Sequence, residues 1–78
     1  MLPKAKWSKT TAQVGELVTF DFNVGGLAST VSGPGAPTRA YTADQPAYSA
    51  RTKFQSAGTV TWTVTNSDGT ASATITIE

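Results

Sequence analysis

Apolar residues occupy every second position in several stretches of the chain, which is the pattern of β-strands that are buried on one face. In residues 16–24 the apolar face holds Val18, Phe20, Phe22 and Val24. In residues 47–54 the corresponding face holds Tyr48, Ala50, Thr52 and Phe54. No stretch repeats apolar residues at the spacing of an amphipathic helix, so we expect no helix.

The longest alternation closes the chain, in the sequence GTVTWTVTNSDGTASATITIE of residues 58–78. Its inward positions are Val60, Trp62 and Val64, followed by Ala71, Ala73, Ile75 and Ile77. The turn between the two halves contains Gly69, which can adopt the positive φ that tight hairpins need. The segment therefore predicts an antiparallel hairpin in which Ala71 and Ala73 leave room for Trp62 and Val64 across the pair.

Weaker strand signals fill the rest of the chain. Short strands are predicted at residues 5–9 and 11–14, as one edge strand in two pieces, and at 27–32 and 38–42. Residues 33–37 (GPGAP) and 43–46 (ADQP) are predicted loops, because proline lacks the amide that a β-ladder uses.

About seven short strands at this spacing predict a single all-β domain over residues 1–78. One sheet alone would leave an apolar face in water, so a second sheet must cover it. The expected fold is a two-sheet antiparallel β-sandwich. Its predicted core consists of Phe20, Phe22, Phe54, Trp62 and Ile75.

The composition removes several kinds of functional site. The 78 residues include no cysteine and no histidine, so we expect no disulfide, no Ser-His or Cys-His pair and no ordinary zinc site. The five carboxylates are scattered over the predicted fold, whereas acid–base pairs need two carboxylates across one cleft. We therefore expect no catalytic residue, no metal and no cofactor, and a protein that is not an enzyme.

The net charge and the apolar runs of the chain limit the kinds of partner and location that we expect. A net charge of +1 is too balanced to indicate a nucleic acid or membrane partner. No apolar run approaches the ~20 residues of a membrane helix. The N-terminal lysines are not followed by the apolar segment of a signal peptide.

Two groups of side chains are candidates for binding a partner. The N-terminal group is basic and aromatic and comprises Lys4, Lys6, Trp7 and Lys9. Such an arm would grip an acidic protein surface or stack on a ligand. In the alternative interpretation the group belongs to an edge strand whose lysines prevent pairing with another chain, and Trp7 lies in the core.

The second group lies in the middle of the chain, and its residue types are common interface anchors. It comprises Arg39, Tyr41, Tyr48 and Arg51. Arg39 and Tyr41 are the favoured contacts, because Tyr48 alternates with an apolar row and burial is its alternative. The nearby loop at residues 33–37 is either a stiff exposed loop or a protruding contact.

Two segments of the chain resemble bacterial and phage immunoglobulin-like domains. The sequence AGTVTWTVTNSDGTASATITI, residues 57–77, is similar to the final hairpin of PKD-type and bacterial immunoglobulin-like modules. The sequence VGELVTFDFNV, residues 14–24, resembles their second strand. The acidic glycine-rich motif of PKD domains is missing. The resemblance implies an immunoglobulin-like sandwich.

The resemblance also implies a function. Phages carry such domains on capsids and tails, so we expect a structural virion protein, a capsid decoration or tail accessory protein at the virion surface. Its partner would be the repeated protein surface of the particle, and it would bind alone or as a homo-oligomer. A start at Met1 without a signal peptide fits this expectation. The alternative is a glycan-binding or spacer module from a larger bacterial surface protein or secreted enzyme, with an extracellular or cell-surface location.

Overall fold

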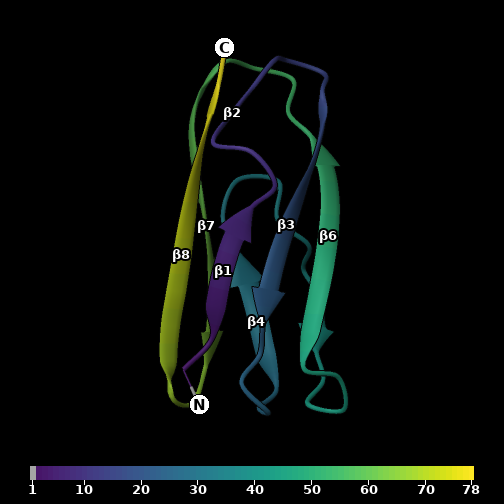
Figure 1. Cartoon of the computed structure of the whole chain (residues 1–78), viewed down its shortest axis with the longest axis vertical. Coiled ribbons are helices and arrows are strands. Elements are labelled where there is room, and N and C mark those ends of the chain that lie inside the picture. The colour runs from purple at the N-terminus through teal and green to yellow at the C-terminus, as the bar shows by residue number, and fades with distance from the viewer. Residues whose placement is uncertain (1) are drawn as a thin grey trace.

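The structure is a computed structural model that describes residues 2–78, and these residues contain strands and no helix (Figure 1). The strands are β1 (Lys4–Trp7), β2 (Thr11–Ala12), β3 (Leu17–Asn23), β4 (Ser29–Ser32), β5 (Ala40–Tyr41), β6 (Ala47–Lys53), β7 (Gly58–Asn66) and β8 (Gly69–Ile77). Met1, on which the expectation of a native start rests, lies outside the described residues.

The strands form two sheets that face each other. One sheet has the order β1-β3-β6 and the other has the order β2-β8-β7-β4-β5. All neighbouring strands are antiparallel except β2 and β8, which are parallel. The prediction of a small all-β domain built from two sheets is therefore confirmed.

The closing hairpin forms in the predicted register. Trp62 lies opposite Ala73 and Val64 lies opposite Ala71, so each large side chain faces a small one across the pair. Gly69 has a φ of 148°, as the turn prediction requires. The apolar row is buried because every second side chain of β7 points towards the other sheet.

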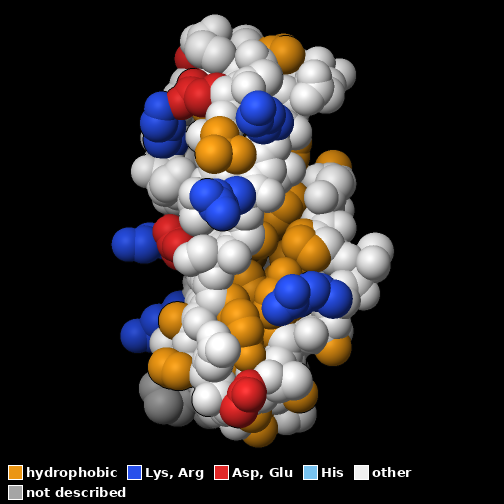
Figure 2. All heavy atoms as spheres, turned by 90° about the vertical axis from the view of Figure 1, so that its right-hand side faces the viewer, with side chains coloured by type: hydrophobic (Ala, Val, Ile, Leu, Met, Phe, Trp, Pro, Cys, Tyr) orange, Lys and Arg blue, Asp and Glu red, His pale blue; other side chains and the backbone are white. Residues whose placement is uncertain are grey.

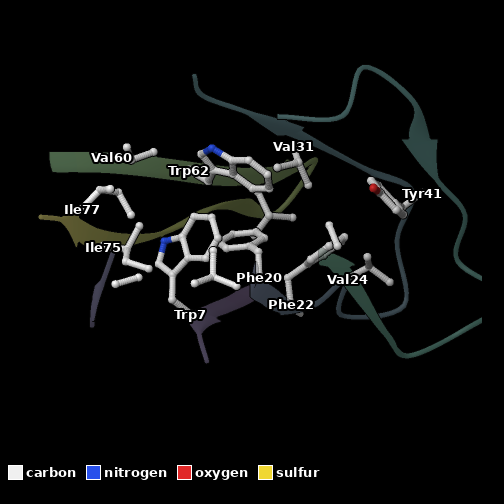
Figure 3. Close-up of a cluster of buried hydrophobic side chains, with 14 residues drawn as sticks. Trp7, Phe20, Phe22, Val24, Val31, Tyr41, Val60, Trp62, Ile75 and Ile77 are labelled. Atoms are coloured by element: carbon white, nitrogen blue, oxygen red, sulfur yellow. The ribbon is translucent and has the colours of Figure 1, made fainter. Parts of the chain in front are cut away.

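The core lies between the sheets and is centred on three aromatic rings (Figure 3). The ring centroids of Trp7 and Trp62 are 4.8 Å apart, and that of Phe20 lies 5.0 Å from Trp7 and 5.3 Å from Trp62. Four of the five predicted core residues are buried. Phe54 is only half-buried, because it follows the last paired residue of β6 at the margin of the sandwich.

The N-terminal segment forms two short edge strands, as predicted, but the two strands belong to different sheets. β1 pairs with β3 in one sheet, and β2 pairs with β8 in the other. Between them, the amide of Ser8 donates to the carbonyl of Thr19 at 2.8 Å. At the far end, the amide of Glu78 donates to the carbonyl of Ala12 at 2.8 Å. This side of the sandwich is therefore closed by the chain itself.

Candidate functional site

The N-terminal basic and aromatic group does not form one surface. Trp7 is 7% exposed, and its indole Nε1 donates to the carbonyl of Ala73 at 3.0 Å. Its proposed role as a partner contact is wrong, because alternate residues of a strand point to opposite faces. Lys4 and Lys6 are exposed on the outer face of β1, and Lys9 forms an ion pair with Glu16 in the link before β3.

The group in the middle of the chain also contains both buried and exposed side chains. Tyr41 is 4% exposed, and its ring packs against Phe22 at 4.8 Å and against Tyr48 at 5.0 Å. The expectation that Tyr41 is a surface contact is wrong, since β5 turns this ring towards the core. Arg39 is exposed, and its guanidinium carbon lies 4.5 Å from the centroid of the Tyr41 ring.

Tyr48 is half-buried on β6, and its hydroxyl holds the loop that follows β5. The hydroxyl donates to the carbonyl of Thr42 at 2.8 Å and lies 3.4 Å from a carboxylate oxygen of Asp44. A hydrogen bond from the Thr42 hydroxyl lowers the pKa of the Asp44 carboxyl, and that from Tyr48 contributes less. These bonds order the loop, so Tyr48 combines an apolar contact with a polar anchor.

The loop at residues 33–37 is held against β7. The indole Nε1 of Trp62 donates to the carbonyl of Pro34 at 2.8 Å. Gly33 has a φ of 137°, and a Cβ at this position would lie 2.6 Å from the carbonyl oxygen of Thr61. Pro34 and Gly35 line a hollow of about 430 Å³ beside Phe54. The loop is thus fixed in place and forms one wall of a surface hollow.

The side of the sandwich along β6 is open. Here the margin of the core carries the half-buried Ala36, Tyr48 and Phe54, and exposed Arg39, Arg51 and Lys53 flank it. We call these six residues the open side. Figure 2, which views the molecule from the side of β6, shows hydrophobic side chains gathered in a strip with basic side chains beside it.

The outer faces of the two sheets have different chemistry. On the five-stranded sheet, β7 and β8 present a row of threonine and serine hydroxyls that bond to each other, as in the 2.8 Å pairs Thr61–Thr74 and Thr63–Ser72. On the three-stranded sheet, a shallow depression of about 750 Å³ includes Lys4, Lys6 and Asp21 in its lining. Asp21 accepts a hydrogen bond from Ser49 at 2.6 Å. The outer face of the three-stranded sheet also carries an exposed apolar side chain, Leu17, at the start of β3.

The described residues contain no group of three or more His, Cys, Asp or Glu side chains that could hold a metal ion. Within the same residues, no helix is long and apolar enough to cross a membrane. Glu16 has a lowered pKa, mainly because the side chain of Lys9 and the amide of Gln13 donate hydrogen bonds to its carboxylate. Since Glu16 and Asp44 bond to their own neighbours, their shifted pKa values reflect local structure.

The architecture is a small two-sheet β-sandwich, and the solved structures that are similar to it include one from a bacterium. It is a crystal structure from Thermotoga maritima described as that of a "putative superoxide reductase". It is 16% identical to this chain with a TM-score of 0.59, over 99% of this chain and 86% of the other. No family model and no curated protein matches the sequence.

This likeness corrects one expectation drawn from the composition. The protein was expected not to be an enzyme, yet a similar sandwich occurs in a protein that is named as one. The composition speaks only against acid–base, nucleophilic and zinc chemistry, whereas a reductase transfers electrons. At 16% identity the likeness concerns the fold and does not assign an activity to this chain.

Proposed function

We propose that this protein is an immunoglobulin-like binding domain that attaches through its open side to a protein surface, and that this surface belongs to a phage particle. The single observation that carries the binding role is the open side itself. It places half-buried aromatic side chains next to exposed arginine and lysine. Aromatic residues and arginine are enriched at protein interfaces, especially where a few side chains supply most of the affinity.

The order of the strands supports the immunoglobulin-like assignment. In immunoglobulin domains, strands A, B and E share one sheet with D, and C, F and G share the other. If β3, β4, β6, β7 and β8 are strands B, C, E, F and G, the observed neighbours match this arrangement. β1 then corresponds to strand A, and β5 lies beside strand C, where variable-type domains add a strand. No described strand occupies the position of D.

The phage assignment is supported by the resemblance of residues 14–24 and 57–77 to bacterial and phage immunoglobulin-like domains. A virion decoration or tail accessory protein attaches to many identical sites. A small sandwich that binds through its open side suits that role. The alternative of a glycan-binding module has less support, because an exposed aromatic ring is needed to stack on a sugar and Tyr41, the favoured aromatic contact, is only 4% exposed.

The test is binding to particles. Labelled protein is mixed with capsids of the phage whose genome carries this reading frame, and the bound fraction is measured after sedimentation. We expect saturation at a fixed number of copies per particle. The double variant Arg51→Glu, Lys53→Glu should lower the affinity, whereas Lys4→Glu, Lys6→Glu on the opposite edge strand should not. No sedimentation of wild-type protein with the particles would rule out the virion role.

A further inference from the structure

The outer edge of β6 is free to accept another strand. β6 pairs with β3 along all seven of its residues, and no strand within residues 2–78 pairs with its other edge. An edge of this length, about 23 Å, presents a row of unpaired amides and carbonyls. Adding an extended segment to such an edge is a common way to bind a peptide.

The apolar side chains beside this edge are suited to the inward face of an added strand. β6 turns Tyr48 and Ala50 towards the core, and Phe54 follows at its end. Tyr48 and Phe54 are only half-buried, so alternate apolar side chains of an added strand would cover them. The hollow beside Phe54, with its volume of about 430 Å³, has room for one such side chain.

The opposite face of β6 indicates what the outward side chains of that strand should be. Arg51 and Lys53 lie opposite Thr19 and Leu17 of β3, so neither faces a carboxylate across the pair. Within residues 2–78, neither side chain makes a hydrogen bond or an ion pair. Opposite charges that face each other on neighbouring strands stabilise a sheet, and an added strand would place its outward side chains next to these two.

Ser49, on the same face, illustrates the contrast. It lies opposite Asp21 of β3 and donates a hydrogen bond to it, so the acidic partner at this position is already supplied from within the sheet. The unmatched positive charge is therefore confined to the C-terminal half of β6.

We propose that a protein segment with alternating carboxylate and apolar side chains adds to β6 as the fourth strand of the β1-β3-β6 sheet. Its apolar side chains cover Tyr48 and Phe54, and its carboxylates pair with Arg51 and Lys53. This deepens the proposed function by naming the chemistry of the partner, and it rests on that function only in taking the partner to be a protein.

The first experiment uses a synthetic peptide and the whole chain. The peptide has about nine residues, enough to span β6, and alternates glutamate with valine. Nuclear magnetic resonance spectra of the protein should show saturable shifts of the amides of residues 47–53. A matched peptide with lysine in place of glutamate should bind about tenfold more weakly or worse, because its charges meet those of Arg51 and Lys53.

Variants and modified peptides separate strand addition from simple charge attraction. Arg51→Glu with Lys53→Glu should weaken binding of the acidic peptide about tenfold. Lys4→Glu with Lys6→Glu changes the net charge equally on β1 and should leave the affinity unchanged. A peptide that is N-methylated along the edge facing β6 should lose binding, since it can no longer donate to the β6 carbonyls.

Three results of the peptide experiments would overturn the proposal. They are no binding of the acidic peptide, equal binding of the lysine peptide, and shifts at β1 instead of β6. Self-association of the protein through β6 would also overturn it, because a second copy would then be the occupant. Particle binding that is insensitive to Arg51→Glu, Lys53→Glu would remove strand addition and keep the virion role. Peptide binding without particle binding would keep strand addition and rule out the virion role.

Discussion

The two long sides of the sandwich differ in how the core is protected. On the side of β1 and β2 the chain crosses from one sheet to the other, and Trp7 bonds to Ala73 of the facing sheet. On the side of β6 no strand within residues 2–78 pairs with the outer edge of β6, and Tyr48 and Phe54 remain half-buried. One side of a small sandwich can thus be closed by a single segment that passes from one sheet to the other, and the side without such a segment keeps half-buried aromatic rings at its margin.

The segment between β4 and β6 explains the difference. It contains the prolines and glycines of residues 33–37 and the ADQP loop, so only the two residues of β5 pair with the sheet. Proline cannot donate to a ladder and glycine is costly to order in a strand. Most of this segment therefore forms loops that surround the open side.

The largest effect is expected from truncating the ring that seals the closed side. Trp7→Ala removes a buried ring that contacts Phe20 and Trp62, and should lower the free energy of unfolding by about 3–5 kcal/mol. Urea denaturation measures this change. Phe54→Ala on the open side is the matched control, and should cost about 1–2 kcal/mol because its ring is half-exposed. Equal losses from the two variants would remove the distinction between the sides.

A smaller loss is expected where the loop at residues 33–37 approaches β7. Gly33→Ala would place a methyl group 2.6 Å from the carbonyl of Thr61 and from the Trp62 ring, and should cost about 1–3 kcal/mol. Gly58→Ala is the control, because Gly58 also has a positive φ but a methyl group there would meet no atom within 4 Å. Thermal unfolding should place Gly33→Ala below Gly58→Ala. The reverse order would contradict the tight approach of the loop to β7.

Loss of one hydroxyl should loosen the open side without unfolding it. Tyr48→Phe removes the hydrogen bond to the Thr42 carbonyl and should cost about 0.5–1 kcal/mol. Amide exchange at residues 42–45 should become faster, while exchange in β7 and β8 stays unchanged. A uniform acceleration across the chain would mean that the hydroxyl supports the whole fold rather than this loop.

The smallest effect concerns pH. The pKa values of Glu16, beside the closed side, and Asp44, beside the open side, are both lowered by hydrogen bonds. A carboxyl whose pKa is lower in the folded state stabilises the fold at neutral pH, and this contribution is lost as the pH falls through that pKa. Glu16→Gln and Asp44→Asn should therefore each reduce the drop in urea midpoint between about pH 7 and pH 2.

The control for both carboxyl variants is the midpoint at the acidic end. Wild-type and variant midpoints should converge at low pH, because the carboxyl is then protonated in the folded and the unfolded chain. A variant that keeps the full wild-type drop would show that its carboxyl does not contribute to the acid sensitivity of the protein.

Much of the fold could be predicted from alternation alone. The rows of β3 and β7, the register of Trp62 against Ala73 and the positive φ of Gly69 were all predicted correctly. The candidate site was predicted less well. Arg39 and Arg51 are exposed as expected, but Trp7 and Tyr41 are buried, since short strands carry too few alternations to indicate which face meets the other sheet.

The sequence by itself determined where the strands lie and which face of each long strand is apolar, because alternation is a local property of an extended backbone. Only the tertiary structure decided that the N-terminal segment crosses between the sheets, that β6 lies at an edge, and that Tyr48, Phe54, Arg51 and Lys53 share one side. The physical reason is that sheet order depends on contacts between residues far apart in the chain, which no local pattern encodes.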